Sequence, residues 1–464
     1  MRRSNHALVL RLLALAAGAA AALACSSEPP PAAPPSDASV AVAPPPAPPP
    51  PAVTASAAAS AAPAAPSGGR PAGKLNVLLV TIDSLRADMP WAGYPRDIAP
   101  VLTAFEKKAV SYTRAYSVSS YTAMSLGGML AGRYPSELDR SGYFFEQYPD
   151  SVTMFPELLQ KAGVRTLSAH AHFYFDRKSG FRQGFDDYRM VPGLKENNKT
   201  DENITSPEHE ALAEQMLSDK ANTGSGKPFF AWFHFLDPHD EYMPHPGIGP
   251  YGKKARDKYD AEVTFVDQHV GKLLDFVKAQ PWGKDTVVIV SADHGEAFGE
   301  HKMYRHGFEV WEVLTHVPLM IQAPGATARH IDAPRSAIDF APTILELTGA
   351  PASSELEGKS LVGEIWGGPA EERDVIIDLP RTTDNDRHRA LVHGKYKIIS
   401  FGDDDAFELY DVVADPGELH DLHREDKATF EDMKARYKAA SAKIHDKCPA
   451  HTEHLRSKNK ARPC

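Results

Sequence analysis

Cysteine, excess basic charge and long apolar runs are all scarce in this chain, and each scarcity excludes a class of protein. Of 464 residues only Cys25, Cys448 and Cys464 are cysteines. In an exported protein the terminal pair suits a structural disulfide better than a nucleophile. The formal net charge of −10 argues against a nucleic-acid partner, because phosphate backbones demand basic surfaces. Beyond the N-terminus, no run reaches the roughly 18 apolar residues that a membrane span requires.

The N-terminus carries the pattern of an export signal. The basic start Met1–Arg3 precedes the mostly apolar stretch Ala7–Ala24, as in a secretory signal peptide. Cys25 resembles a bacterial lipoprotein cleavage site, although the leucine, Leu23, lies two residues before the cysteine rather than the usual three. We expect residues 1–25 to be a signal peptide of the lipoprotein type. The protein would then be anchored to the cell envelope, in the periplasm or at the outer membrane, by an N-terminal lipid. Plain secretion and an uncleaved anchor are the alternatives.

Composition divides the rest of the chain into segments. Residues 26–73 are mostly Pro, Ala and Ser, which cannot bury a core, so they predict a disordered tether. The remaining residues suffice for a large core. We expect a catalytic domain over 74–370, a small α+β subdomain over 371–447 and a basic tail over 448–464.

Apolar runs alternate with helical stretches from residue 74 onward. This alternation predicts a three-layer α/β/α sandwich with a mostly parallel sheet, followed by a small C-terminal α+β region. The polar stretch 187–226 predicts a surface excursion. Predicted strands are 75–82, 165–169, 229–236, 286–290 and 317–322, and predicted helices are 100–110, 122–130, 152–162, 260–279 and 337–347. In the C-terminal region we expect short antiparallel strands at 374–378, 390–393 and 396–400 and a final helix over 426–445.

Three of the predicted strands end on acidic residues or histidine. Asp83 follows the first, Asp237 and His239 follow the second, and Asp293 and His294 follow the third. Polar groups just past the carboxyl ends of parallel strands are where open α/β sheets bind ligands. A carboxylate beside an imidazole suits a metal site. The alternative is that these residues only cap turns and helices.

Two hydroxyls stand at the start of the predicted helix 122–130. Thr122 and Ser125 are either ordinary capping residues or include a nucleophile, because a helix N-terminus favours an anionic group. A free hydroxyl is a poor nucleophile, so it needs a base or a metal to activate it. The aspartates and histidines at the strand ends would supply that metal.

The chain resembles the sulfatases of the alkaline phosphatase superfamily through an ordered set of motifs from about residue 74 to about residue 422. The matching segments are Thr81-Ile-Asp83-Ser-Leu-Arg-Ala-Asp88, 122–135, Leu236-Asp-Pro-His-Asp-Glu-Tyr242, 291–301, 315–325, 339–343, 408–411 and 415–418. The resemblance implies a divalent metal ion bound by Asp83, Thr122, Asp293 and His294. It also implies a substrate-contacting histidine at His239 and a cationic substrate contact at His306.

Departures from the family pattern narrow the chemistry. Thr122 stands where sulfatases have the Cys or Ser that becomes formylglycine, and the arginine of that motif is absent. Ser84 replaces the second of two adjacent aspartates. The family's lysine-bearing segment is missing, and His170 and His172 lie near its place. His294 replaces an asparagine, so Zn or Mn is favoured over Ca or Mg. These features resemble the branch with a threonine nucleophile.

Three functions remain open from the sequence. The first is hydrolysis of sulfate or phosphate esters or diesters through a covalent intermediate on Thr122. The second is transfer of phosphoethanolamine or glycerophosphate groups to envelope glycans or lipids. The third is a non-catalytic surface binding protein with the same fold. The expected partner is a sulfated or phosphorylated small molecule, glycan or lipid head group, and the oligomeric state stays open.

Overall fold

The computed structural model describes residues 69–450 apart from 177–178, 196–202 and 383–384. The predicted signal peptide, most of the predicted tether and Cys464 lie outside the described residues. All of the described residues belong to one compact unit. Within its described part, no helix combines the length and the apolar character needed to cross a bilayer.

An eight-stranded sheet forms the centre of this unit, and every strand but one runs in the same direction. Only β11 is antiparallel to its neighbours, so the predicted mostly parallel sheet is confirmed. The strand order is β12 (Arg329–Ile331), β2 (Val110–Tyr112), β11 (Leu319–Gln322), β7 (Thr286–Ala292), β1 (Asn76–Ile82), β6 (Phe229–Phe235), β4 (Arg165–His170) and β5 (Asp187–Met190).

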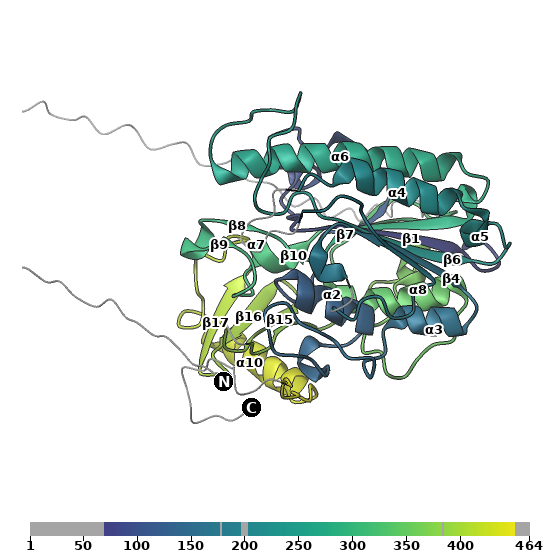
Figure 1. Ribbon diagram of the computed structural model, residues 1–464. Helices are drawn as coiled ribbons and strands as arrows, with labels where there is room; N and C mark the ends of the chain where they lie inside the picture. Colours follow the sequence, from purple (N-terminus) through teal and green to yellow (C-terminus); the bar gives the residue numbers. More distant parts are fainter. Residues whose placement is uncertain (1–68, 177–178, 196–202, 383–384, 451–464) are drawn as a thin grey trace, which may run out of the picture. The chain divides into compact units, whose positions relative to one another are not determined.

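Helices cover both faces of the sheet (Figure 1). Strand β1 is buried throughout, and its side chains alternate between two cores, as strand geometry requires. Val77 and Leu79 point to one core and Leu78 and Val80 to the other. The first core holds α2 (Thr122–Ala131), α3 (Phe155–Lys161) and α8 (Phe340–Thr348), and the second holds α1 (Pro100–Glu106), α4 (Ser206–Ser218) and α6 (Ala255–Ala279). The predicted three-layer α/β/α sandwich is confirmed.

The prediction of a surface excursion over 187–226 is wrong. This segment contains strand β5 and helices α4 and α5 (Lys220–Thr223). The apolar stripe of α4 is narrow, because Ala213, Met216 and Leu217 are its buried apolar residues. These three pack on the sheet. The other residues of the helix are mostly polar, so the composition of the segment does not reveal its apolar stripe.

The predicted strand 317–322 is two strands. Residues His316–Val317 form β10, which pairs with β3 (Ala115–Tyr116) in a small separate sheet, while β11 joins the main sheet. Pro318 lies between them, and a proline has no N–H with which to continue a ladder. The remaining short elements are β8 (Ala297–Phe298), β9 (Tyr304–Arg305), α7 (Glu312–Thr315), β13 (Arg335–Ser336) and α9 (Val362–Ile365).

A second, four-stranded antiparallel sheet follows near the C-terminus, and its presence confirms the predicted small α+β region. Its strands are β14 (Val375–Leu379), β15 (His388–His393), β16 (Tyr396–Phe401) and β17 (Ala406–Asp411). Helix α10 (Lys427–Ser441) packs against Leu391 and Ile398 on one face. Ala390 and Ile399 on the other face join the main core. Cys448 forms a disulfide, whose partner lies outside the described residues.

Candidate active site

The ends of three adjacent strands bring two aspartates and a histidine together. Thr81 of β1 pairs with His234 of β6 and with Ser291 of β7, so these three side chains share one face of the sheet. Asp83 and Asp293 lie two residues beyond Thr81 and Ser291 and therefore point to the same side. His234 Nε2 is 3.3 Å from Asp83 Oδ2 and 3.9 Å from Asp293 Oδ2. All three residues are buried, and their geometry suits a metal ion.

Thr122 lies over this cluster at the start of α2. It is the first helical residue, whereas Tyr121 occupies the N-cap position without a capping side-chain hydrogen bond. The Thr122 hydroxyl oxygen lies 3.1 Å from His294 Nε2 and 3.4 Å from Asp83 Oδ2. Ser125, one turn later, donates a hydrogen bond to the main-chain oxygen of Asp293 (2.6 Å). Thr122 thus faces the cluster, while Ser125 fastens the helix to the strand end.

His294 presents a lone pair to Thr122. Its Nδ1 lies 2.9 Å from the carbonyl oxygen of Gly295, and because a carbonyl can only accept, Nδ1 carries the proton. Burial lowers the pKa of His294 to about 3, which keeps the imidazole neutral. Gly295 is needed here because a Cβ would lie 2.2 Å from the main-chain oxygen of Val313.

His234 is a site residue that the motifs do not reveal, because it lies inside an apolar strand. Trp232 donates its indole N–H to Thr81 Oγ1 (2.9 Å), and His234 Nδ1 lies 2.8 Å from the same oxygen. A hydroxyl oxygen has two lone pairs and can accept from both. These contacts fix the orientation of the ring, so that Nε2 faces the two aspartates. Strand alternation is the sequence signal that identifies it, since His234 is level with Thr81, two residues before Asp83.

The cluster has the character of a cation site. Among the described residues, Asp293 Oδ2 is buried without a hydrogen-bond partner. Burial, together with the nearby carboxylate of Asp83, raises the pKa of Asp293 to about 7. Two carboxylates and two imidazole nitrogens are a donor set that Zn²⁺ and Mn²⁺ accept. The residues therefore fit the divalent ion that the motifs imply.

His306 and His239 lie on the outer side of this cluster. The His306 ring is 4.3 Å from that of His294 and 5.8 Å from that of His239. Burial alone would lower the pKa of His306, but the carboxylate of Glu296, 3.3 Å from Nδ1, outweighs it and raises the pKa to about 9. The six site residues predicted from the sequence therefore lie in one place, with His234 added.

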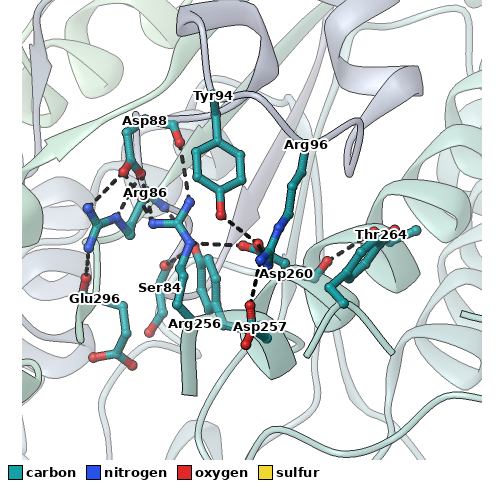
Figure 2. A network of polar contacts seen from close by, with 12 residues as sticks. Ser84, Arg86, Asp88, Tyr94, Arg96, Arg256, Asp257, Asp260, Thr264 and Glu296 are labelled. Carbon is teal, nitrogen blue, oxygen red and sulfur yellow. Dashed lines mark hydrogen bonds and ion pairs between the residues drawn. The ribbon is translucent and has the colours of Figure 1, made fainter. Parts of the chain in front are cut away.

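Arg86 and Asp88, at the end of the first motif, stabilise the loop after β1. Figure 2 shows Arg86 between Asp88 and Glu296: it binds the Asp88 carboxylate (2.7 Å) and donates to the main-chain oxygen of Glu296 (2.7 Å). Arg256 of α6 binds both Asp88 (3.2 Å) and Asp260 (2.8 Å). This network ties the loop after β1 to α6 and to the loop after β7, which fixes the position of Asp83.

A pocket of about 600 Å³ opens above Thr122, within the usual size range of ligand sites. Asp83 of the cluster lines it beside Thr122, and many of the other lining side chains are aromatic. The lining residues are Asp83, Tyr121, Thr122, Ala123, Phe144, Phe145, His172, Phe173, Tyr174, Phe175, Leu236, His239, Asp240, Tyr304, Arg305, His306 and Phe308. Much of the wall comes from two segments that the motifs do not include, Phe144–Phe145 and His172–Phe175.

Comparison with known proteins decides the family. The family model "Sulfatase" matches residues 75–350, more than half of the chain. The chain belongs to the sulfatase family. A second model, the C-terminal region of N-sulphoglucosamine sulphohydrolase, matches residues 299–445. The resemblance seen in the motifs is thereby confirmed, and so is the prediction of an enzyme of the sulfuric ester hydrolase class.

The chain is similar to one curated sulfatase in sequence and to two solved structures in fold. The choline-sulfatase of Rhizobium meliloti (strain 1021) is 26% identical over 449 residues, covering 78% of this chain and 86% of its own. A solved structure in complex with its substrate D-glucosamine-2-N,6-O-disulfate has a TM-score of 0.65 at 18% identity and covers 81% and 99% of the two chains. The phosphonate monoester hydrolase of Agrobacterium radiobacter has a TM-score of 0.66 at 16% identity, covering 80% and 96%. At these identities the two structures show a shared fold.

The two histidines noted near the missing lysine segment differ in position within this sulfatase-family site. His170 is fully buried, and its Nε2 lies 2.7 Å from the hydroxyl of Ser168. His172 lines the pocket, and its Nδ1 accepts the main-chain N–H of Tyr174 (3.2 Å). Of the two, only His172 is therefore placed to face a substrate.

Proposed function

We propose that the protein is a metal-dependent hydrolase of sulfate or phosphate esters or diesters that uses Thr122 as its nucleophile. The observation that carries this proposal is the position of the Thr122 hydroxyl. It lies at a helix N-terminus, 3.1 Å from His294 Nε2 and 3.4 Å from Asp83 Oδ2, at the bottom of an open pocket. A threonine there cannot become formylglycine, so it must act through its own oxygen.

Asp83, His234, Asp293 and His294, together with Thr122, would hold the divalent ion. The two imidazoles favour Zn or Mn over Ca and Mg. Bound there, the ion supplies positive charge that favours the alkoxide of Thr122 and stabilises charge on the non-bridging oxygens of the ester. His234 replaces the second aspartate of the family motif, since Ser84 lacks a carboxylate and uses its hydroxyl to donate to Asp83 (2.8 Å).

The side chains around Thr122 divide the reaction between them. The Thr122 hydroxyl gives its proton to solvent, its oxygen attacks the sulfur or phosphorus atom, and the bond from that atom to the leaving alcohol breaks. His306 or His239 gives a proton to the departing oxygen. The same histidine then takes a proton from a water molecule, whose oxygen attacks the covalent intermediate. The bond to the Thr122 oxygen breaks, sulfate, phosphate or the remaining phosphate ester leaves, and Thr122 regains a proton from solvent. The helix N-terminus holds the anion during both steps.

We propose that the substrate is a sulfated or phosphorylated small molecule, glycan or lipid head group. Similarity to a choline-sulfatase supports a sulfate ester as the substrate. The fold shared with a phosphonate monoester hydrolase is compatible with attack at a phosphorus atom. From the sequence alone, we also propose that the enzyme is exported and lipid-anchored to the cell envelope.

The test is a panel of aryl sulfate, phosphate monoester, phosphate diester and phosphonate substrates, each with Mn, Zn, Ca and Mg. We expect turnover of at least one class, with loss of activity when a chelator removes the metal. Thr122→Val keeps the shape of the side chain without the hydroxyl and should lower turnover by at least about 10³-fold. Thr122→Ser is the matched control, because it restores the hydroxyl.

Two outcomes would contradict this function. Turnover like that of the wild type in Thr122→Val, with unchanged melting temperature and metal content, would remove Thr122 from the chemistry. Equal inactivity of the wild type on every ester and metal would favour group transfer or a non-catalytic binding role.

A further inference from the structure

The walls of the pocket are built from aromatic rings that the proposed chemistry does not use. Five of these side chains surround the opening, and we call them the aromatic rim: Phe144, Phe145, Phe173, Tyr304 and Phe308. Seven large apolar side chains are exposed in the described part of the chain, and four of them belong to the rim. Their exposed fractions run from 37% for Phe173 to 67% for Tyr304. Exposed aromatics that gather at one pocket mark a binding surface.

Ring contacts hold most of the rim in place. Phe144 stacks on Tyr121 at a centroid distance of 4.5 Å and on Phe308 at 5.8 Å. Phe145 contacts Phe144 at 5.7 Å and Phe173 at 5.6 Å. These spacings are those of favourable aromatic pairs. The rings are therefore oriented by one another and stand ready before a ligand arrives.

From the rim, the ring contacts continue to the histidines of the site. The His172 ring lies 4.1 Å from that of Phe173 and 6.0 Å from that of His239. Gly307 lets Phe144 approach closely, since its φ is +103° and a Cβ there would lie 3.1 Å from Phe144. A group attached to an anion at Thr122 must therefore extend between aromatic rings.

The aromatic rim offers little to a highly charged or hydroxyl-rich group, because the Tyr304 hydroxyl is the one polar side-chain group among its five members. Arg305 is the one arginine or lysine among the described lining residues. It is committed to Asp240 (2.6 Å), with Glu241 3.8 Å away. A second sulfate group near Arg305 would be repelled by the Asp240 carboxylate, which already neutralises the guanidinium. Sugar hydroxyls would lose their water, and the rings could not replace those hydrogen bonds.

We propose that the aromatic rim binds a flat apolar group, so that the substrate is the sulfate or phosphate ester of an aromatic alcohol. This rests on the proposed function of Thr122 for the position of the ester. A planar ring fits between rings at the spacing they already adopt, and it leaves no hydroxyl unsatisfied. The rim thereby selects against sulfated sugars such as the one bound in the structurally similar protein.

Binding to the inactive Thr122→Val protein tests this without turnover. The full chain, loaded with Mn or Zn, is titrated calorimetrically with 2-naphthyl sulfate, galactose 6-sulfate and inorganic sulfate, and with the corresponding phosphates. The rim variant adds Phe145→Ser and Phe308→Ser to this background, since both side chains are exposed and their loss spares the core. Leu419→Ser, at a residue 82% exposed and remote from the lining, is the matched control.

We expect the naphthyl ester to bind at least about tenfold more tightly than the sugar ester, because stacked aromatic groups add to area burial. The rim variant should lose about tenfold in naphthyl affinity and leave the affinity for inorganic anion unchanged. The Leu419→Ser control should match its parent. Equal affinity for the two esters, no binding of the naphthyl ester, or an unchanged affinity in the rim variant would overturn the proposal.

The two proposals fail in different ways. If the naphthyl ester binds through the rim but the wild type hydrolyses none of the esters, then the function assigned to Thr122 fails and the aromatic subsite stands. If the wild type hydrolyses sugar and naphthyl esters with equal kcat/KM, then Thr122 chemistry stands and the rim does not select the substrate.

Discussion

The floor of the pocket and its aromatic rim are built by opposite principles. The floor consists of Asp83, which lines the pocket, and of His234, Asp293 and His294 behind it, all buried, with Thr122 above them. Its residues stand at or next to the ends of adjacent parallel strands, whose register fixes their distances. The rim comes from loops and short elements, and four of its five rings are exposed. A rigid scaffold therefore positions the chemistry, while variable segments select what reaches it.

Removal of His234 should have the largest effect on the floor. In His234→Gln the Nε2 lone pair between Asp83 and Asp293 is lost, so we expect metal affinity to fall by at least about 10-fold to 100-fold. Titration with Zn or Mn, read by calorimetry and by the metal content of the dialysed protein, measures this.

His170→Gln is the matched control for that variant. His170 is equally buried and pairs with His234 across β4 and β6, yet it contacts neither aspartate. Metal affinity should stay unchanged in His170→Gln. An equal loss in both variants would mean that any change in this row of residues disturbs the site, and His234 would not be a ligand.

Loss of the Arg86 guanidinium should weaken the scaffold below the floor. Arg86→Met removes one donor each from Asp88, Glu300 and the main-chain oxygen of Glu296, while Arg256 still binds Asp88. Because the two carboxylates are partly exposed, we expect the free energy of unfolding to fall by about 1–3 kcal/mol. Urea denaturation measures it.

Arg436→Met on α10 serves as the comparison for a surface ion pair. Arg436 and Asp432 are 38% and 66% exposed, so its effect should stay within about 0–1 kcal/mol. Equal losses in the two variants would show that the Arg86 network is no more than a surface pair.

The last prediction concerns the pH dependence of the free energy of unfolding. Glu262 of α6 accepts from the main-chain N–H of Met243 and lies 2.7 Å from His245 Nε2. Burial raises its pKa from 4.5 to about 7. The folded state then binds more protons than the unfolded state between these values, so stability should fall as pH rises from 4.5 to 7. Glu262→Gln should flatten this dependence, as measured by denaturation at pH 5 and pH 8.

The sequence predicted the floor far better than the rim. Asp83, Asp293 and His294 follow apolar runs, and the carboxyl ends of parallel strands must meet. His234 was not predicted as a site residue because it is a single polar residue within an apolar run, although alternation from Asp83 places it on the same face of the sheet. Helix α4 was not predicted because only a narrow apolar stripe of it is buried. Phe144, Phe145 and Phe173 could not be placed, because loop conformation depends on long-range packing that a local pattern does not encode.

The most direct test of the account is the stereochemical course of the reaction. A thiophosphate ester that is chiral at phosphorus through two oxygen isotopes is hydrolysed by the metal-loaded wild type in water enriched in the third isotope, and the configuration of the thiophosphate product is determined. Attack by Thr122 followed by attack of water is two inversions, so we predict net retention. Inversion would mean that water attacks the ester directly, and it would contradict a covalent intermediate on Thr122.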